Sequence, residues 1–169
     1  NDGLATIGSY AFRNCSKLTT LTFNEELTTI GNYAFEGCSN LESITFNDNL
    51  VTIGSYAFNG CTGLTGDLVI PASVTSIGNY AFYGCTGLDG KLTIEGNENG
   101  TSIGQYAFYN CSKFSSLELG EGVSSIGQWA FYNCSGMKGA LVIPDSVTSI
   151  ETYAFYNCSG FDSLKLSEN

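Results

Sequence analysis

The sequence predicts an α/β solenoid: a stack of similar units with one parallel β-sheet on one face and short helical or 3-10 turns on the other. A near-identical string, Ile-Gly-x-Tyr-Ala-Phe-x-x-Cys, begins at Ile7, Ile30, Ile53, Ile77, Ile103, Ile126 and Ile150. The steps between these isoleucines are 23, 23, 24, 26, 23 and 24 residues, each the length of one supersecondary unit. One such unit cannot bury its apolar face alone, so we expect all seven to stack.

A short helical turn is the first element expected in each unit. In the first unit Ala11, Phe12, Cys15 and Leu18 are spaced one, three and three residues apart, which would place them on one side of a helix or 3-10 turn. The phenylalanine occurs in every unit, and an aromatic side chain repeated at a fixed position is expected in the core. The predicted ladder is Phe12, Phe35, Phe58, Phe82, Phe108, Phe131 and Phe155.

The cysteine three residues later is predicted to be a buried, unreactive thiol. The chain has no histidine, no Cys-x-x-Cys and an odd number of thiols, and stacked neighbours would point their side chains in parallel. We therefore predict neither a metal site nor disulfides at Cys15, Cys38, Cys61, Cys85, Cys111, Cys134 and Cys158.

The residue before each cysteine is always asparagine or glycine: Asn14, Gly37, Gly60, Gly84, Asn110, Asn133 and Asn157. These two residue types share a tolerance of the left-handed backbone region, so a positive φ is predicted there. Asn-Cys-Ser also matches a glycosylation sequon, but that explanation does not account for the glycines.

An aromatic row precedes the Ala-Phe pair at Tyr10, Tyr33, Tyr56, Tyr80, Tyr106, Trp129 and Tyr153. We expect the rings to pack within the stack at the convex rim, with their hydroxyls in water. Stacking of sugar rings on this row is the alternative interpretation.

A strand follows, as in residues 18–23, and a polar turn then leads to the next isoleucine. The outward strand positions change from unit to unit, and the strand side of a curved solenoid is the usual binding surface. The candidate binding residues are Thr20, Thr22, Ser43, Thr45, Asp67, Val69, Lys91, Thr93, Ser116, Glu118, Ala140, Val142, Ser163 and Lys165. They are small and weakly polar, without the aromatic or arginine anchors typical of tight interfaces.

Composition limits the partners. Residues 1–169 form one repeat domain, whose two ends look cut from a longer array because Asn1-Asp2-Gly3 opens directly into repeat sequence. The net charge of −10 argues against nucleic acid and anionic membranes. No run approaches the ~20 apolar residues of a membrane span.

Catalysis, metals and cofactors are not predicted. Without histidine, the triads that activate serine or cysteine nucleophiles cannot form, and no phosphate-binding or dinucleotide glycine pattern occurs. Acidic turns at Glu25-Glu26, Asp48 and residues 95–98 lack the spacing of known calcium loops, so a solvated acidic surface is expected.

The unit Leu-x-Ile-Pro-x-Ser-Val-Thr-Ser-Ile-Gly-x-Tyr-Ala-Phe-x-x-Cys-x-x-Leu is complete at Leu68–Leu88 and, with Glu151 and Phe161 as variants, at Leu141–Phe161. It resembles the BspA-like class of leucine-rich repeats over essentially the whole chain. The resemblance implies a leucine-rich-repeat stack, an extracellular or cell-surface location and adhesion to host or cell-surface proteins; it supplies no ligand residues. Glu151 stands where other units have glycine, which indicates that this position does not require a positive φ.

The function we expect is a non-enzymatic adhesion or recognition module that binds through its strand face. One alternative is a structural spacer or filament segment that self-associates end to end, because an uncovered terminal strand invites further pairing. The other is carbohydrate or ice binding through threonine rows, although the threonines on the strand face are irregular.

Overall fold

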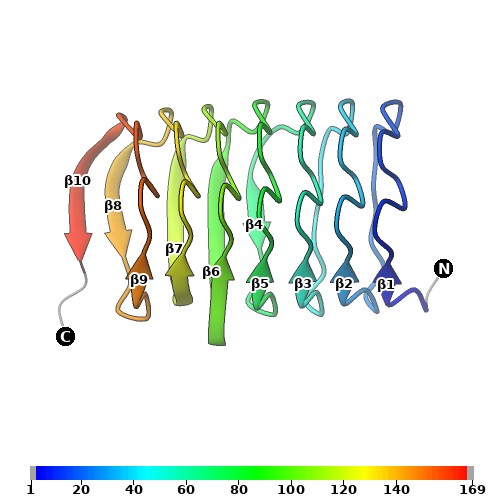
Figure 1. The fold of residues 1–169 in the computed structure, drawn as a ribbon, viewed down its shortest axis with the longest axis horizontal. Helices are drawn as coiled ribbons and strands as arrows, with labels where there is room; N and C mark the ends of the chain where they lie inside the picture. The colour runs from blue at the N-terminus through cyan, green and yellow to red at the C-terminus, as the bar shows by residue number, and fades with distance from the viewer. Residues whose placement is uncertain (1–2, 167–169) are drawn as a thin grey trace.

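A computed structural model describes residues 3–166 as a stack of seven coils (Figure 1). We number the coils 1–7 by the isoleucine that each contains, from Ile7 to Ile150. Asn1 and Asp2, on which the expectation of a cut N-terminus rests, lie outside the described residues. The strands are β1 (Thr6–Ile7), β2 (Thr29–Ile30), β3 (Thr52–Ile53), β4 (Leu68–Ile70), β5 (Ser76–Ile77), β6 (Lys91–Ile103), β7 (Ser116–Ile126), β8 (Gly139–Ile143), β9 (Ser149–Ile150) and β10 (Phe161–Leu166).

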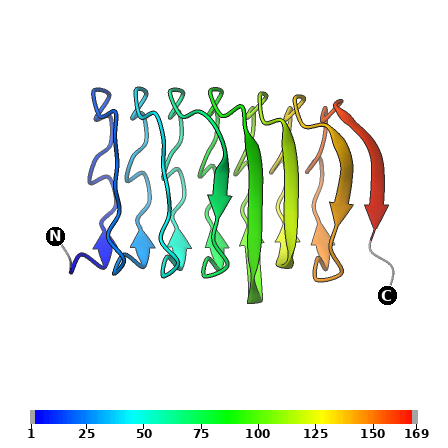
Figure 2. The same cartoon turned by 180° about the vertical axis from the view of Figure 1, so that it is seen from behind.

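Strands lie on two sides of the solenoid, which corrects the expectation of one sheet on one face. The short strands β1, β2, β3, β5 and β9 run upward on the near side of Figure 1, and β4, β8 and β10 run downward on the far side, which Figure 2 brings to the front. The long strands β6 and β7 bend at the lower edge and belong to both sides. All pairing is parallel, in the order β1-β2-β3-β5-β6-β7-β9, with β4 on β6 and a separate β8–β10 pair.

The short strands were missed as strands because each has two residues, too few to show an alternating pattern. The sequence predicts a polar turn at this place, before each isoleucine. They nevertheless pair in strict register, with isoleucine opposite isoleucine from Ile7 to Ile150. Each isoleucine therefore stacks on its copy in the neighbouring coil.

The predicted helical or 3-10 turns do not form anywhere in residues 3–166; a chain of reverse turns takes their place. In coil 1 the amides of Ala11, Arg13 and Cys15 donate to the carbonyls three residues before them, at 3.1–3.3 Å. The amides that alternate with these three donate to carbonyls of coil 2 instead, as the Tyr10 amide does to the Asn32 carbonyl at 2.9 Å. Every second amide thus bonds the next coil.

Backbone dihedral angles explain why reverse turns form in place of a helix. Tyr10 has φ 63° and Asn14 has φ 60°, and the same two positions are left-handed in every coil. A right-handed helix needs negative φ at each residue, whereas a type II turn needs a positive φ at its third position. The positive φ predicted at the asparagine/glycine position is confirmed, and the one at the tyrosine position was not foreseen.

In coils 1 and 2 the segments 18–23 and 41–46 are not strands, although the sequence predicts strands there. Phe23 and Phe46 occupy inward positions that hold Ile70, Ile94 and Ile143 in later coils. The two rings stack 5.9 Å apart, wider than the ~4.8 Å between paired strands.

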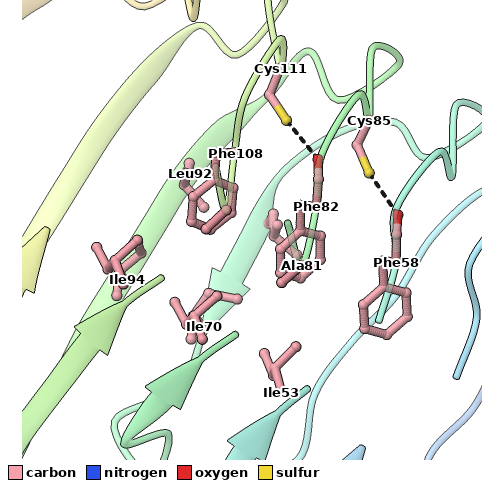
Figure 3. Packing of buried hydrophobic residues seen from close by; sticks show 14 of the residues in the cluster. Ile53, Phe58, Ile70, Ala81, Phe82, Cys85, Leu92, Ile94, Phe108 and Cys111 are labelled. Carbon is pink, nitrogen blue, oxygen red and sulfur yellow. Dashed lines mark hydrogen bonds between the residues drawn. The ribbon is translucent and has the colours of Figure 1, made fainter. Parts of the chain in front are cut away.

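The core between the two sides consists of the predicted ladders. In coils 2–6 the isoleucine, alanine, phenylalanine and cysteine of the repeat are all buried. The phenylalanine rings stack at 5.0–5.3 Å from Phe12 to Phe155. Figure 3 shows Phe58, Phe82 and Phe108 pointing inward toward Ile70 and Ile94 of the opposite side.

Candidate binding surfaces

The strand face, as we call the side that carries β4, β8, β10 and the first halves of β6 and β7, presents all the candidate binding residues. Each of the fourteen is exposed or half-buried, while the residues that alternate with them in β4, β6 and β8 are buried in the core. In register across coils, Val69 lies beside Thr93, and Thr93 beside Glu118. The structure thus assembles one surface from positions that are about 25 residues apart in sequence.

Two charged side chains on this face neutralise each other. Lys91 Nζ contacts Glu118 Oε2 across neighbouring coils, and both side chains are about half exposed. Asp67 Oδ1 accepts a hydrogen bond from the Lys91 amide at 2.7 Å and so helps to define where β6 begins. The net charge of this region comes from the acidic residues around it.

A hollow of about 200 Å³ opens on the strand face where the irregular segment of coil 2 meets β4. Its floor is apolar, with Phe46, Val69 and Pro71, and Asp48 and Glu95 stand among its lining residues. Next to it, a hollow of about 310 Å³ is lined by Thr22, Ser43 and Thr45, among others. Candidate residues therefore line both hollows.

The central thiols are buried and hydrogen-bonded in this geometry. Six of them donate S–H bonds to the phenylalanine carbonyl of the preceding coil at 3.0–3.3 Å, as Cys85 does to Phe58 and Cys111 to Phe82 (Figure 3). Burial raises the pKa of Cys111 well above its usual value and that of Cys158 to about 11. The predicted burial is confirmed for the five central thiols, and their lack of reactivity stays a prediction; Cys15 in coil 1 is exposed and Cys158 is half-buried.

Two rows of aromatic rings lie on the opposite side, which we call the aromatic face. The predicted row stacks with nearly parallel planes from Tyr10 to Trp129, and the rings from Tyr10 to Tyr106 are 4.5–4.7 Å apart. Packing within the stack is confirmed. Because each ring covers the face of the next, the row presents ring edges and hydroxyls to solvent.

A second row was not foreseen: Tyr83, Tyr109, Tyr132 and Tyr156 stack at 4.9, 4.6 and 5.2 Å. Each also touches the first row, as Tyr106 touches Tyr109 at 5.5 Å. The signal was present in the sequence, because the residue after the core phenylalanine is tyrosine in the last four units. In coils 1–3 that position holds Arg13, Glu36 and Asn59, which bond one another.

Further polar ladders flank the rings. The hydroxyl residues Thr6, Thr29, Thr52, Ser76, Ser102, Ser125 and Ser149 are paired in register along the short strands. Asn157 Nδ2 donates to Asn133 Oδ1, and Asn133 Nδ2 to Asn110 Oδ1, at 2.6 and 2.8 Å. These side-chain amides join neighbouring coils by hydrogen bonds, which agrees with the structural interpretation of Asn-Cys-Ser.

In residues 3–166, histidine, cysteine, aspartate and glutamate form no group of three or more that could hold a metal ion. That part of the chain also has no helix long and apolar enough to cross a membrane.

Comparison with known proteins adds a family. The model of the "BspA type Leucine rich repeat region" matches residues 1–98 and 91–169, in six copies. No curated protein sequence matches the chain.

Several solved structures have a similar fold. A leucine-rich repeat protein of T. pallidum is 28% identical with a TM-score of 0.82, over 95% of this chain and 74% of that one. A leucine-rich repeat protein of Eubacterium ventriosum is 27% identical with a TM-score of 0.83, and this chain spans only 43% of its length. The pneumococcal vaccine antigen PcpA, at 23% identity, a TM-score of 0.58, and coverage of 99% of this chain and 50% of its own, shows the fold alone.

Proposed function

Because the chain belongs to the BspA-type leucine-rich repeat family, we propose that it is a non-enzymatic recognition module that binds a host or cell-surface protein across its strand face. Family membership supports a binding role without catalysis and a place outside the cell. The observation that carries the proposal is the contrast on one side of the solenoid. The inward strand residues are leucine, isoleucine or phenylalanine in every coil, whereas the outward residues vary between small, hydroxyl, apolar and charged types.

The shape of the strand face fits a protein ligand. Small outward side chains such as Ser116, Ala140 and Thr93 allow another backbone to approach closely. The two hollows at coils 1–4 can receive larger side chains. Acidic residues at one hollow favour a ligand with positive charge, because electrostatic complementarity raises association rates.

Replacing Lys91 by Glu together with Thr93 by Arg tests this proposal. Lys91→Glu replaces the contact with Glu118 by two neighbouring carboxylates, and Thr93→Arg places a long side chain between Val69 and Glu118, its register partners in the two adjacent coils. We expect loss of binding to a panel of extracellular host proteins, measured by surface plasmon resonance, with the melting temperature nearly unchanged.

The matched control is Thr86→Arg, at an exposed position in the turn at the upper edge of the solenoid. This variant should bind like the wild type. Binding that survives the double substitution would show that the ligand lies elsewhere on the molecule.

A second candidate function, end-to-end stacking as a spacer or filament, is favoured by the two ends of the described stack. Phe12 in coil 1 and Ile150 in coil 7 are 43% and 44% exposed, although their copies in the central coils are buried. Light scattering against concentration tests this candidate. A mass that stays monomeric at every concentration contradicts it.

A further inference from the structure

The aromatic face of coils 4–7 is a second surface that the proposed function does not use. It contains the four tyrosines of the second row, the adjoining rings from Tyr80 to Tyr153, and the amides of Asn79, Gln105 and Gln128. Tyr153 and Tyr156 are 49% and 54% exposed, and the other rings are half-buried. We propose that this face is a self-association surface on which two copies of the chain pack with their aromatic rows against each other.

Charge distinguishes this face from the rest of the molecule. Residues 75–88, 101–112 and 123–137 contain no charged side chain, and residues 146–161 contain only Glu151. The chain as a whole carries a net charge of −10. Two copies therefore repel each other in most orientations and least when these faces meet, since Glu151 is the only charged residue in the four segments.

Chemical self-complementarity supports a second copy as the occupant. A phenol hydroxyl and a side-chain amide each donate and accept hydrogen bonds, so identical rows can pair with each other. An interface between two equivalent copies requires this property, because the same patch serves both.

The spacing of the rings along the stack also favours a second copy as the occupant. The second-row rings recur every 4.6–5.2 Å, and any other copy has the same spacing. If a ring of one copy lies opposite a ring of the other at one coil, the rings therefore lie opposite each other at all four coils. A polymer with a different repeat would drift out of register along the face.

Ring orientation argues against sugar as the occupant. Sugars bind aromatic residues chiefly through ring faces, and within the rows each face is covered by the next ring. What remains exposed is a flat array of edges and hydroxyls. The rings are already fixed by their neighbours, so little side-chain entropy is lost when the face is covered.

The area of the aromatic face limits how tightly two copies can bind each other. Two rows over four coils offer on the order of a few hundred Å² per copy, less than the ~800 Å² per partner of a standard stable interface. We therefore expect weak pairing of free chains, with a Kd in the micromolar to millimolar range. If many copies of the chain were held on one surface, avidity would strengthen this weak pairing.

Sedimentation velocity of the chain from micromolar to millimolar concentration tests the proposal. The weight-average mass should rise toward that of a dimer. Tyr132→Lys puts a charge into both facing rows and should raise the Kd at least about tenfold. Val69→Lys makes a change on the strand face that adds the same charge and should leave the Kd unchanged.

Hydroxyl-radical footprinting of the wild type gives a readout that needs no variant: Tyr132 and Tyr156 should lose reactivity at high concentration. Three results would overturn the proposal. One is a monomer at every concentration. Another is association that persists in Tyr132→Lys but is lost in Phe12→Lys, which would indicate end-to-end stacking. The third is binding of dextran, a neutral polysaccharide, to a protein that stays monomeric.

Discussion

At the scale of single residues, each central cysteine is a small apolar side chain whose S–H bonds the neighbouring coil. Burial, followed by repulsion between neighbouring thiolates, raises the pKa of Cys85, Cys111 and Cys134 well above the usual value. Burial, followed by repulsion between neighbouring phenolates, likewise raises the pKa of Tyr80 and Tyr109. The folded stack thus keeps these groups protonated at a pH at which the unfolded chain ionises them.

This difference predicts alkaline destabilisation. A group whose pKa is raised on folding gives its full stabilisation below the unfolded pKa, about 8.5 for a thiol, and loses it as the pH rises above that value. The free energy of unfolding, measured with urea under reducing conditions, should be flat from pH 7 to about 8.5 and then fall. Each proton that the folded chain retains and the unfolded chain loses lowers the free energy of unfolding by up to about 1.4 kcal/mol per pH unit.

Cys111→Ala provides the comparison, because it removes one titrating group. Its stability at neutral pH will be lower, but its decline per pH unit above the thiol pKa should be smaller than that of the wild type. A free energy of unfolding that is constant up to pH 10 would contradict the burial of the thiols.

At the scale of the element, stacking requires the glycine that follows the isoleucine in coils 2–6. A Cβ on Gly104 would lie 2.7 Å from backbone atoms of residues 77–79 in the preceding coil. No positive φ occurs at this position, as Glu151 indicated from the sequence. Where Glu151 replaces glycine, the ring planes of Trp129 and Tyr153 tilt by 32°, against 2–11° along the rest of the row.

Gly104→Ala is therefore expected to destabilise the fold by about 1–3 kcal/mol in urea unfolding, the usual cost of overpacking. The control is Gly8→Ala in coil 1, where a Cβ meets nothing within 4 Å and the change should stay within about 0.5 kcal/mol. Equal effects at the two positions would show that backbone freedom, rather than coil stacking, selects glycine.

At the scale of the whole molecule, stability is a sum of contacts between neighbouring coils. Phe82 is fully buried between Phe58 and Phe108, whereas Phe12 stacks on Phe35 alone and is 43% exposed. Phe82→Ala should cost about 3–5 kcal/mol, and Phe12→Ala markedly less. Thermal unfolding of both variants checks this difference, and similar losses would mean that the coils do not behave as a linear stack.

The sequence by itself determined the repeat, the number of coils, the core ladders and the left-handed asparagine/glycine position. Each of these follows from one coil and its identical neighbours, so the periodicity alone reveals it. The outward orientation of residues such as Thr93 and Lys91 was predictable for the same reason. That they bind a ligand stays a prediction.

Only the tertiary structure decided the rest. A spacing of three residues suits both a helix and a chain of turns, and the left-handed tyrosines, which bond the next coil, select the turns. Two-residue strands such as β2 are stable only when a neighbouring coil pairs with them. The second tyrosine row and the uncharged face arise where residues about 24 positions apart come together, because stacking makes surfaces from side chains that no single unit holds.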